Sequence, residues 1–209
     1  MMLTSDTAVA DFSTPETRTS VRIANDAYYT PDALATALVA KLNADGFWSG
    51  GHVLEPSAGG GAFVRAAAAT KPHPQTITAI DIDPVANDRL RRSDTPARVI
   101  CQDFRDAVGE YELIIGNPPF SAAQEHTELA LERRTFGGVV AFLLRLAFLE
   151  TQGRAQFWRD NPASKVYVLS ERPSFTGGKT DSCAYGFFVW QRGWRDPTEL
   201  EVISWRGRT

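Results

Sequence analysis

The sequence of 209 residues contains only two cysteines, Cys101 and Cys183, and three histidines. Two thiols cannot build a disulfide scaffold or a cysteine-rich metal cluster, and we predict that both are reduced and mostly buried. His126 has no histidine or cysteine partner at the spacing of metal ligands, so we interpret it as a capping or solvent-facing side chain. The composition therefore excludes a disulfide-rich secreted protein and gives no indication of a bound metal.

A long hydrophobic run is also absent. The longest apolar stretch, residues 137–149, is interrupted by Arg145 and is typical of a strand that leads into a helix. The first residues include Asp6 and Asp11 and lack the apolar core of a signal peptide. We therefore expect no membrane association and a cytoplasmic location, with the oligomeric state, a monomer or a weak dimer, left open.

The net charge is −3, so the chain lacks the basic excess of a protein that coats DNA. The charge is unevenly distributed: residues 1–116 contain 10 Lys and Arg against 15 Asp and Glu, and residues 117–209 contain 12 against 10. A polyanionic partner should therefore meet the C-terminal half, through individual arginines rather than a global field.

Strand-like and helix-like segments alternate along residues 23–209, after a polar segment, residues 1–22, that we predict to be a flexible tail. The alternation predicts a single α/β domain with a mostly parallel, Rossmann-like sheet, helices on both faces and an antiparallel hairpin at one edge. The seven predicted strands are residues 52–55, 76–82, 98–102, 111–116, 137–144, 165–170 and 184–190, with residues 200–205 a candidate for a further edge strand. Helices are predicted at residues 33–42, 121–134 and 147–158, among others.

The most informative stretch is Asn117-Pro118-Pro119-Phe120, directly after the buried strand predicted at residues 111–116. The tetrapeptide should lie at the carboxyl end of that strand, where open α/β sheets bind ligands. Two prolines stiffen the turn and remove N–H donors, and the Asn117 amide oxygen adds an acceptor beside a flat ring. Acceptors for an exocyclic amino group next to a ring that can stack indicate a pocket for a nucleobase.

A strand, a glycine-rich turn and a helix follow one another at residues 52–69, an arrangement typical of nucleotide binding. Val64 stands where a G-x-G-x-x-G frame counted from Gly59 and Gly61 needs its third glycine, and no Lys-Ser/Thr follows as in a phosphate loop. The turn therefore indicates a ligand without a pyrophosphate. Glu55, at the end of the strand, is placed to meet a cationic ammonium group.

Acidic residues end the next two predicted strands. Asp81 comes about 20 residues after the glycines and is placed to accept both hydroxyls of a ribose, whereas Asp83 is assigned to capping the helix that starts at Pro84. Asp103 is placed to accept an adenine amino group, with Phe104 packed on the ring. The series of acids at neighbouring strand ends favours a nucleoside ligand.

The segment before the first predicted helix is expected to border the same ligand. Thr30 is predicted as the N-cap of the helix at residues 33–42, and Pro31 as its first residue. We interpret the amino end of this helix, together with Tyr28 and Tyr29, as a structure that closes over a cofactor.

The loop at residues 171–181 is basic and carries one aromatic residue. Arg172, Lys179 and Phe175 are the side chains that suit backbone phosphates and a displaced base. The alternative is an ordinary surface hairpin with Phe175 tucked inward.

Taken in order, these motifs resemble those of S-adenosylmethionine-dependent amino-methyltransferases, especially the small, stand-alone N6-adenine DNA methyltransferases of the phage type. The likeness spans residues 28–190 and implies the class I methyltransferase fold, S-adenosylmethionine as cofactor and DNA as partner. The implied cofactor-binding residues are Tyr29, Thr30, Pro31, Glu55, Pro56, Ser57, Ala58, Gly59, Gly61, Asp81, Ile82, Asp103 and Phe104. The implied catalytic residues are Asn117, Pro118, Pro119 and Phe120, and the implied substrate contacts are Phe175, Arg172 and Lys179.

The pocket predicts a mechanism. The Asn117 side-chain oxygen and the Pro118 carbonyl would accept the hydrogens of adenine N6 in a flipped base and direct its lone pair at the sulfonium methyl. Relatives with fixed recognition sites often append a target-recognition domain, for which this chain has no room. Strong sequence specificity by that route is therefore not expected.

Other functions stay open at this point. The same tetrapeptide serves methylation of guanine N2 in RNA and of glutamine N5 in proteins, because each substrate presents a planar amino group. A catalytically idle fold that only binds nucleic acid is the alternative from another class. A nicotinamide dehydrogenase is disfavoured by Val64.

Overall fold

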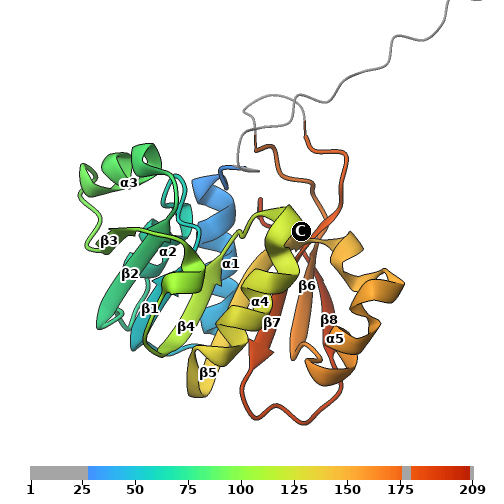
Figure 1. Cartoon of the computed structure of the whole chain (residues 1–209). Coiled ribbons are helices and arrows are strands. Elements are labelled where there is room, and N and C mark those ends of the chain that lie inside the picture. The colour runs from blue at the N-terminus through green and yellow to red at the C-terminus, as the bar shows by residue number, and fades with distance from the viewer. Residues whose placement is uncertain (1–27, 176–179, 208–209) are drawn as a thin grey trace, which may run out of the picture.

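The computed structural model describes residues 28–175 and 180–207 (Figure 1), so the predicted tail at residues 1–22 lies outside the described part. The described strands form an eight-stranded sheet in the order β3-β2-β1-β4-β5-β7-β6-β8. The strand bounds are His52–Glu55 (β1), Thr76–Asp81 (β2), Arg98–Cys101 (β3), Tyr111–Gly116 (β4), Arg134–Arg145 (β5), Lys165–Leu169 (β6), Tyr185–Gln191 (β7) and Glu199–Ile203 (β8). β7 is antiparallel to β5 and β6, and the other neighbouring strands are parallel.

Helices cover both faces of the sheet (Figure 1). Their bounds are Asp32–Ala44 (α1), Ala62–Ala68 (α2), Pro84–Arg91 (α3), Ala123–Glu132 (α4) and Ala155–Asp160 (α5). Leu34 of α1 and Phe63 of α2 share a buried cluster with Ile115 of β4. Ala130 of α4 shares the second cluster with Ile114, the neighbouring residue of the same strand. Because successive side chains of a strand point to opposite faces, β4 supplies both cores.

The predicted mostly parallel α/β sheet with one antiparallel strand is confirmed, but the predicted count of seven strands is wrong. Residues 199–203 add β8, which pairs in parallel with β6 and forms the edge of the sheet. The antiparallel strand β7 lies between β5 and β6 instead of at the edge. Its residues are buried from Tyr185 to Trp190, and a strand so apolar requires a neighbour on each side.

The helix predicted at residues 147–158 is broken. Leu146–Leu149 (η4) and Gln152–Arg154 (η5) are 3-10 turns, and α5 follows only at Ala155. The ring of Phe148 lies 5.5 Å from that of Trp158. In an unbroken α-helix, ten residues would separate these two positions by about 15 Å along the axis. The break therefore allows the aromatic residues to pack together.

The start of α1 differs from the prediction. Pro31 is the N-cap residue and makes no side-chain capping bond. Thr30, predicted as the cap, has its hydroxyl 3.1 Å from the Asn117 amide nitrogen, from which it accepts a hydrogen bond. Asp83 caps α3 as predicted, because its carboxylate accepts from the backbone N–H of Val85. The Thr30 contact ties the amino end of α1 to the motif that follows β4.

The prediction of buried thiols is wrong for Cys101, which is exposed, and Cys183 is half-buried. Cys101 ends β3, which lies at the edge of the sheet formed by the described strands. Within residues 28–175 and 180–207, no helix is long and apolar enough to span a bilayer. In the same ranges, no three His, Cys, Asp or Glu side chains are grouped so that they could hold a metal ion.

Candidate functional site

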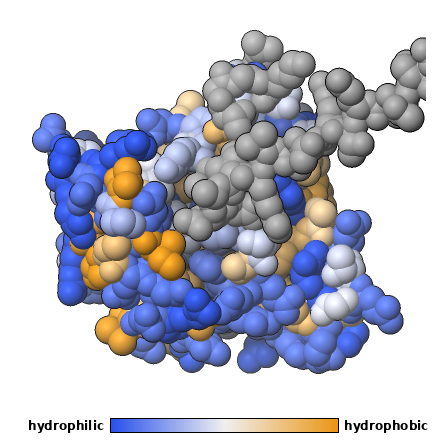
Figure 2. Space-filling model, turned by 45° about the horizontal axis from the view of Figure 1, so that its top comes forward, coloured by the Kyte–Doolittle hydropathy of each residue, from blue (hydrophilic) through white to orange (hydrophobic). Residues whose placement is uncertain are grey.

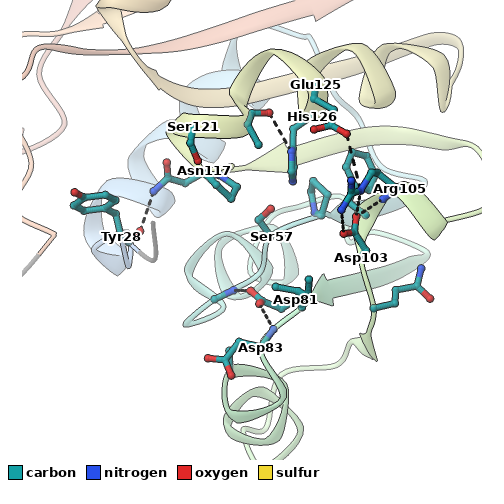
Figure 3. A pocket seen from close by; sticks show the side chains of 18 of the residues that line it. Tyr28, Ser57, Asp81, Asp83, Asp103, Arg105, Asn117, Ser121, Glu125 and His126 are labelled. Carbon is teal, nitrogen blue, oxygen red and sulfur yellow. Dashed lines mark hydrogen bonds and ion pairs between the residues drawn. The ribbon is translucent and has the colours of Figure 1, made fainter. Parts of the chain in front are cut away.

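The carboxyl ends of β1 to β4 open onto a cleft of about 960 Å³ (Figure 3). This volume lies within the roughly 300–1,000 Å³ of small-molecule sites. Figure 2 turns that side of the molecule toward the viewer and shows a mainly hydrophilic face with apolar residues in small separate groups. The cleft is lined by Tyr28, Tyr29, Pro56, Ser57, Gly59, Asp81, Ile82, Asp83, Ala86, Gln102, Asp103, Phe104, Arg105, Asn117, Pro119, Ser121, Ala122, Glu125 and His126.

The glycine-rich turn after β1 passes close beneath a tyrosine ring. Gly59 has a φ of +47°, and a Cβ atom there would lie 3.2 Å from ring carbons of Tyr29. Gly61, the N-cap of α2, has a φ of +76°, and a Cβ atom there would lie 2.6 Å from Leu90. Larger residues at either position would displace a packed side chain and adopt a backbone conformation that favours glycine. The two glycines therefore keep the turn in close contact with its surroundings.

Glu55 ends β1 and is almost completely buried. Its Oε2 accepts a hydrogen bond of 2.9 Å from the backbone N–H of Val64, in the first turn of α2. Gly61 offers no side chain for capping, so Glu55 performs this role. Burial raises the pKa of the Glu55 carboxyl well above its usual range, and the nearby Asp81 carboxylate adds to the increase. Glu55 lines a smaller cavity, of about 20 Å³, next to the cleft.

Asp81 ends β2 and is held by the backbone of two turns (Figure 3). Its Oδ2 accepts from the N–H of Gly59 at 2.7 Å, and its Oδ1 accepts from the N–H of Asp83 at 2.8 Å. A carboxylate has about four acceptor sites, so both oxygens keep a lone pair for a ligand donor. The next residue, Ile82, lines the cleft with 60% of its surface exposed. A polar acceptor and an apolar wall thus lie side by side.

Asp103 follows β3 and is clamped by an arginine (Figure 3). Arg105 donates to both carboxylate oxygens, from Nε at 3.0 Å and from an Nη at 2.6 Å. These hydrogen bonds lower the pKa of Asp103 to about 2, so the carboxylate is ionised at neutral pH. The buried ring of Phe104 lies 5.4 Å from the ring of His126, which is half-buried on α4. Burial lowers the pKa of His126, which favours its neutral form.

Asn117 follows β4 and has a fixed amide orientation. Its Nδ2 lies 3.0 Å from the carbonyl oxygen of Tyr28 and 3.1 Å from the hydroxyl of Thr30. A carbonyl can only accept, so the nitrogen must face Tyr28 and the oxygen must face away. That oxygen, Oδ1, is buried and has no hydrogen-bond partner within the described ranges. The site therefore contains an unpaired acceptor at the corner formed with Pro119.

The aromatic residues expected to stack on a base pack against one another. Phe120 and Phe175 have ring centroids 6.4 Å apart, and both contact Tyr28 and Tyr185. The guanidinium carbon of Arg145 lies 4.4 Å from the centroid of Phe120. We call these four rings and Arg145 the aromatic cluster. Phe175 is thus tucked inward, which is the alternative considered from the sequence, and its contact with a base stays a prediction.

The structure brings most of the predicted cofactor residues to the two cavities. Those that line one or both are Tyr29, Thr30, Glu55, Pro56, Ser57, Ala58, Gly59, Asp81, Ile82, Asp103 and Phe104. Pro31 and Gly61 line neither cavity. In the tetrapeptide, Asn117 and Pro119 line the cleft, Pro118 is buried, and Phe120 lies in the aromatic cluster. Arg172 is exposed on its loop, and Lys179 lies outside the described residues.

Sequence reasoning missed part of the cleft wall. Arg105 and Gln102 flank Asp103, and Glu125 and His126 belong to the first turn of α4. Their proximity to predicted site residues was the available signal: any helix that follows Phe120 would start beside the same corner. Nothing in the local pattern indicated that Arg105 clamps Asp103.

The model of the methyltransferase small domain family matches residues 27–143, more than half of the chain. No curated protein sequence matches the chain. The match covers β1 to β4 and most of β5, and therefore all the strands whose ends form the cleft.

Solved structures with the same fold include three bacterial and archaeal proteins. A candidate class I S-adenosylmethionine-dependent methyltransferase from Listeria monocytogenes has a TM-score of 0.66 at 15% identity, covering 88% of this chain and 68% of its own. A candidate RNA methyltransferase from Pyrococcus horikoshii has a TM-score of 0.65 at 17% identity, and the match covers 79% of this chain and 87% of that protein. The methyltransferase subunit of a type I restriction-modification system from Streptococcus thermophilus has a TM-score of 0.69 at 13% identity. The match covers 85% of this chain and 47% of that subunit. The chain belongs to the methyltransferase small domain family and is a class I methyltransferase with S-adenosylmethionine as its cofactor.

Proposed function

We propose that this enzyme transfers the methyl group of S-adenosylmethionine to the exocyclic N6 of adenine in DNA. The observation that carries the proposal is the unpaired, buried Oδ1 of Asn117 beside the cleft. A buried acceptor without a partner costs roughly 1–3 kcal/mol, so its retention indicates a donor that arrives with the substrate. An exocyclic amino group supplies such a donor.

The residues of the cleft fit the cofactor. Gly59 borders the cleft, and its lack of a side chain keeps the turn close beneath Tyr29, where a Cβ atom would lie 3.2 Å from the ring. Asp81 retains lone pairs for ribose hydroxyls, and the exposed Ile82 offers an apolar surface for adenine. Asp103, ionised and oriented by its arginine clamp, can accept from the adenine amino group. The methionine portion would then lie toward the smaller cavity and Asn117.

When bound, the cofactor supplies an electrophilic sulfonium methyl group. Asn117 Oδ1 and the Pro118 carbonyl would each accept one N6 hydrogen, which localises the nitrogen lone pair that is otherwise delocalised into the ring. The lone pair would form the new N–C bond as the methyl–sulfur bond breaks, and S-adenosylhomocysteine would be the leaving product. The alkylated nitrogen becomes acidic and releases one hydrogen as a proton to water. No strong general base is needed before the attack.

The target adenine must leave the duplex to reach this corner, at a cost of a few kcal/mol. Stacking on aromatic rings offsets this cost, and Phe120 adjoins the corner directly. One of the similar structures is the methyltransferase subunit of a type I restriction-modification system, and this likeness favours DNA as the substrate class. The similar Pyrococcus horikoshii protein bears the name of an RNA methyltransferase, so RNA is the competing substrate.

The proposal is tested by incubating the purified protein with methyl-labelled cofactor and with DNA, RNA or a protein mixture in separate reactions. Enzymatic digestion of the labelled product and chromatography of its nucleosides then identify the modified atom. We expect label in N6-methyl-deoxyadenosine. Label confined to RNA nucleosides, or to protein, would refute adenine N6 of DNA as the target.

A further inference from the structure

Arg145, at the end of β5, has a guanidinium that is held in place while its terminal donors are free within the described residues. It ends β5, beside the tetrapeptide that follows β4, and its guanidinium lies over the rings of Phe120 and Tyr28 at 4.4 and 5.8 Å. Its Nε donates a long hydrogen bond of 3.4 Å to the hydroxyl of Tyr185. That hydroxyl in turn donates to Asp181 at 2.7 Å. The side chain is therefore positioned by two rings and one hydroxyl.

The terminal nitrogens of Arg145 have no such partners. Within residues 28–175 and 180–207, neither Nη atom donates a hydrogen bond, and no carboxylate oxygen lies within 4.0 Å. Other cleft and core arginines differ. Arg105 donates to the carboxylate of Asp103, and Arg154, which also lies over a ring, donates to two backbone carbonyls.

The geometry points to a phosphate-binding role for Arg145. We infer that its Nη atoms bind a backbone phosphate of the substrate next to the target nucleotide. A guanidinium presents its N–H groups as a planar fork that matches two phosphate oxygens, and such charge-assisted bonds are about twice as strong as neutral ones. The rings restrict the fork before binding, so less side-chain freedom is lost when phosphate arrives.

This inference rests on the proposed function and narrows it to a polynucleotide substrate. A glutamine side chain of a protein carries no anion for Arg145, and the sulfonium of the cofactor adds a second positive charge to the site. Arg145 also belongs to the C-terminal half, where basic residues outnumber acidic ones, 12 to 10. A phosphodiester chain that leads away from the corner of Asn117 therefore meets a complementary charge at Arg145.

The test measures binding of a short fluorescent single-stranded oligodeoxynucleotide that contains adenine, by anisotropy at several salt concentrations. The variants are Arg145→Gln, Arg145→Lys and the control Arg159→Gln, which removes an exposed arginine of α5. For Arg145→Gln we expect about tenfold weaker binding and a log–log salt slope shallower by about 0.7, the value for one phosphate contact. Arg145→Lys should keep the slope and recover part of the affinity, because the charge remains but the fork is lost.

Two companion measurements separate this inference from the proposed function. The affinity of Arg145→Gln for S-adenosylhomocysteine should equal that of the unaltered protein, which also shows that the variant is folded. An Arg145→Gln slope equal to that of Arg159→Gln overturns the phosphate contact, even if adenine is methylated. Conversely, a shallower slope in a protein that labels no adenine supports the phosphate contact and refutes the adenine activity. If the unaltered protein binds no oligonucleotide and the methyl label is found in protein, the inference is overturned.

Discussion

The two sides of the cleft differ in how completely their polar groups are paired. On the cofactor side, formed by the ends of β1 to β3, Glu55, Asp81 and Asp103 all accept hydrogen bonds from the chain itself. On the target side, formed by the ends of β4 and β5, Asn117 Oδ1 and the Arg145 Nη atoms have no partner within the described ranges. The polar groups of the first side are paired within the chain, whereas those of the second leave an acceptor and donors available for the proposed substrate.

This difference separates the two kinds of effect that substitutions should have. Paired carboxylates hold their positions in the free protein, so altering them should weaken cofactor binding and loosen local structure. An unpaired buried acceptor does not stabilise the free protein, so altering it should affect mainly the transition state. Four substitutions test this distinction.

The largest effect is expected for Asn117→Ala. Removing a preorganised group that acts on the reacting centre typically lowers kcat by about 10²–10³-fold. We expect a loss of at least this size in single-turnover methylation, with unchanged affinity for S-adenosylhomocysteine by calorimetry. Asn43→Ala, at a half-buried asparagine whose side chain donates to the carbonyl of Lys71, is the control. Asn117→Asp keeps an acceptor but cannot donate to the Tyr28 carbonyl. Its turnover should therefore lie between that of Asn117→Ala and that of the control. Retained turnover in Asn117→Ala would contradict the proposed role.

The second effect concerns Asp81→Asn on the cofactor side. An amide has one acceptor oxygen in place of two, so the N–H of Gly59 or that of Asp83 loses its partner. We expect about tenfold to hundredfold weaker cofactor binding, with kcat at saturating cofactor largely preserved. Asp88→Asn, at an exposed carboxylate of α3 that pairs with Arg91, serves as the control. A fall in kcat without a change in cofactor affinity would show that Asp81 acts in methyl transfer and not in cofactor binding.

The third prediction uses Asp45, outside the cleft, to test whether a paired carboxylate stabilises this fold. Burial opposes its ionisation, but hydrogen bonds from Tyr167, Lys41 and Lys165 outweigh it and lower its pKa to about 2. The folded pKa lies below the unfolded value of about 3.9, so the contribution is complete above about pH 5 and is lost as the pH falls toward 2. We expect Asp45→Asn to lower the free energy of unfolding by about 1–2 kcal/mol at pH 7.

Urea titrations at pH 7 and at pH 3 measure this effect. The difference in the free energy of unfolding between Asp45→Asn and the unaltered protein should be smaller at pH 3 than at pH 7. At pH 3, part of the Asp45 carboxylate is already protonated in the unfolded chain. An equal difference at both values would show that lost packing, and not charge, accounts for it.

The smallest effect is expected for Arg105→Gln. Without its clamp, the pKa of Asp103 should rise from about 2 toward its usual value, so the carboxylate becomes protonated at a higher pH. Cofactor affinity should therefore begin to fall below about pH 5 in the variant, while the unaltered protein keeps it, with a difference of about twofold near pH 4. Calorimetry across this range measures it, with Arg91→Gln as the control. Parallel pH profiles would show that Arg105 does not control the ionisation of Asp103.

The parts that the sequence predicted are those decided by local pattern. From the apolar run of β4 and the acid at the end of β2, both strands could be predicted. The same features predicted the edge of the sheet at which Asn117 and Asp81 would lie. β8 was harder to predict from the sequence, because its apolar residues Leu200 and Val202 are exposed. The less exposed side of the strand carries the charged residue Glu201. The break before α5 depends on rings that pack across it, which no helical period records.

The contacts that the sequence did not predict join segments far apart in the chain. Arg145 meets Phe120 across 25 positions, and the Tyr28 carbonyl meets Asn117 across 89. Such approaches follow from sheet order and from the path of the chain before α1, neither of which is encoded in the residues around each motif. The orientation of the Asn117 amide, on which the proposed mechanism depends, was therefore available only from the structure.

A structure of the protein with S-adenosylhomocysteine and an adenine nucleoside or oligonucleotide tests the central claim most directly. The account predicts that N6 of the target base lies within about 3.2 Å of Asn117 Oδ1, with the amide nitrogen still bonded to the Tyr28 carbonyl. A base whose amino group lies elsewhere, with Asn117 Oδ1 still unpaired, would contradict it.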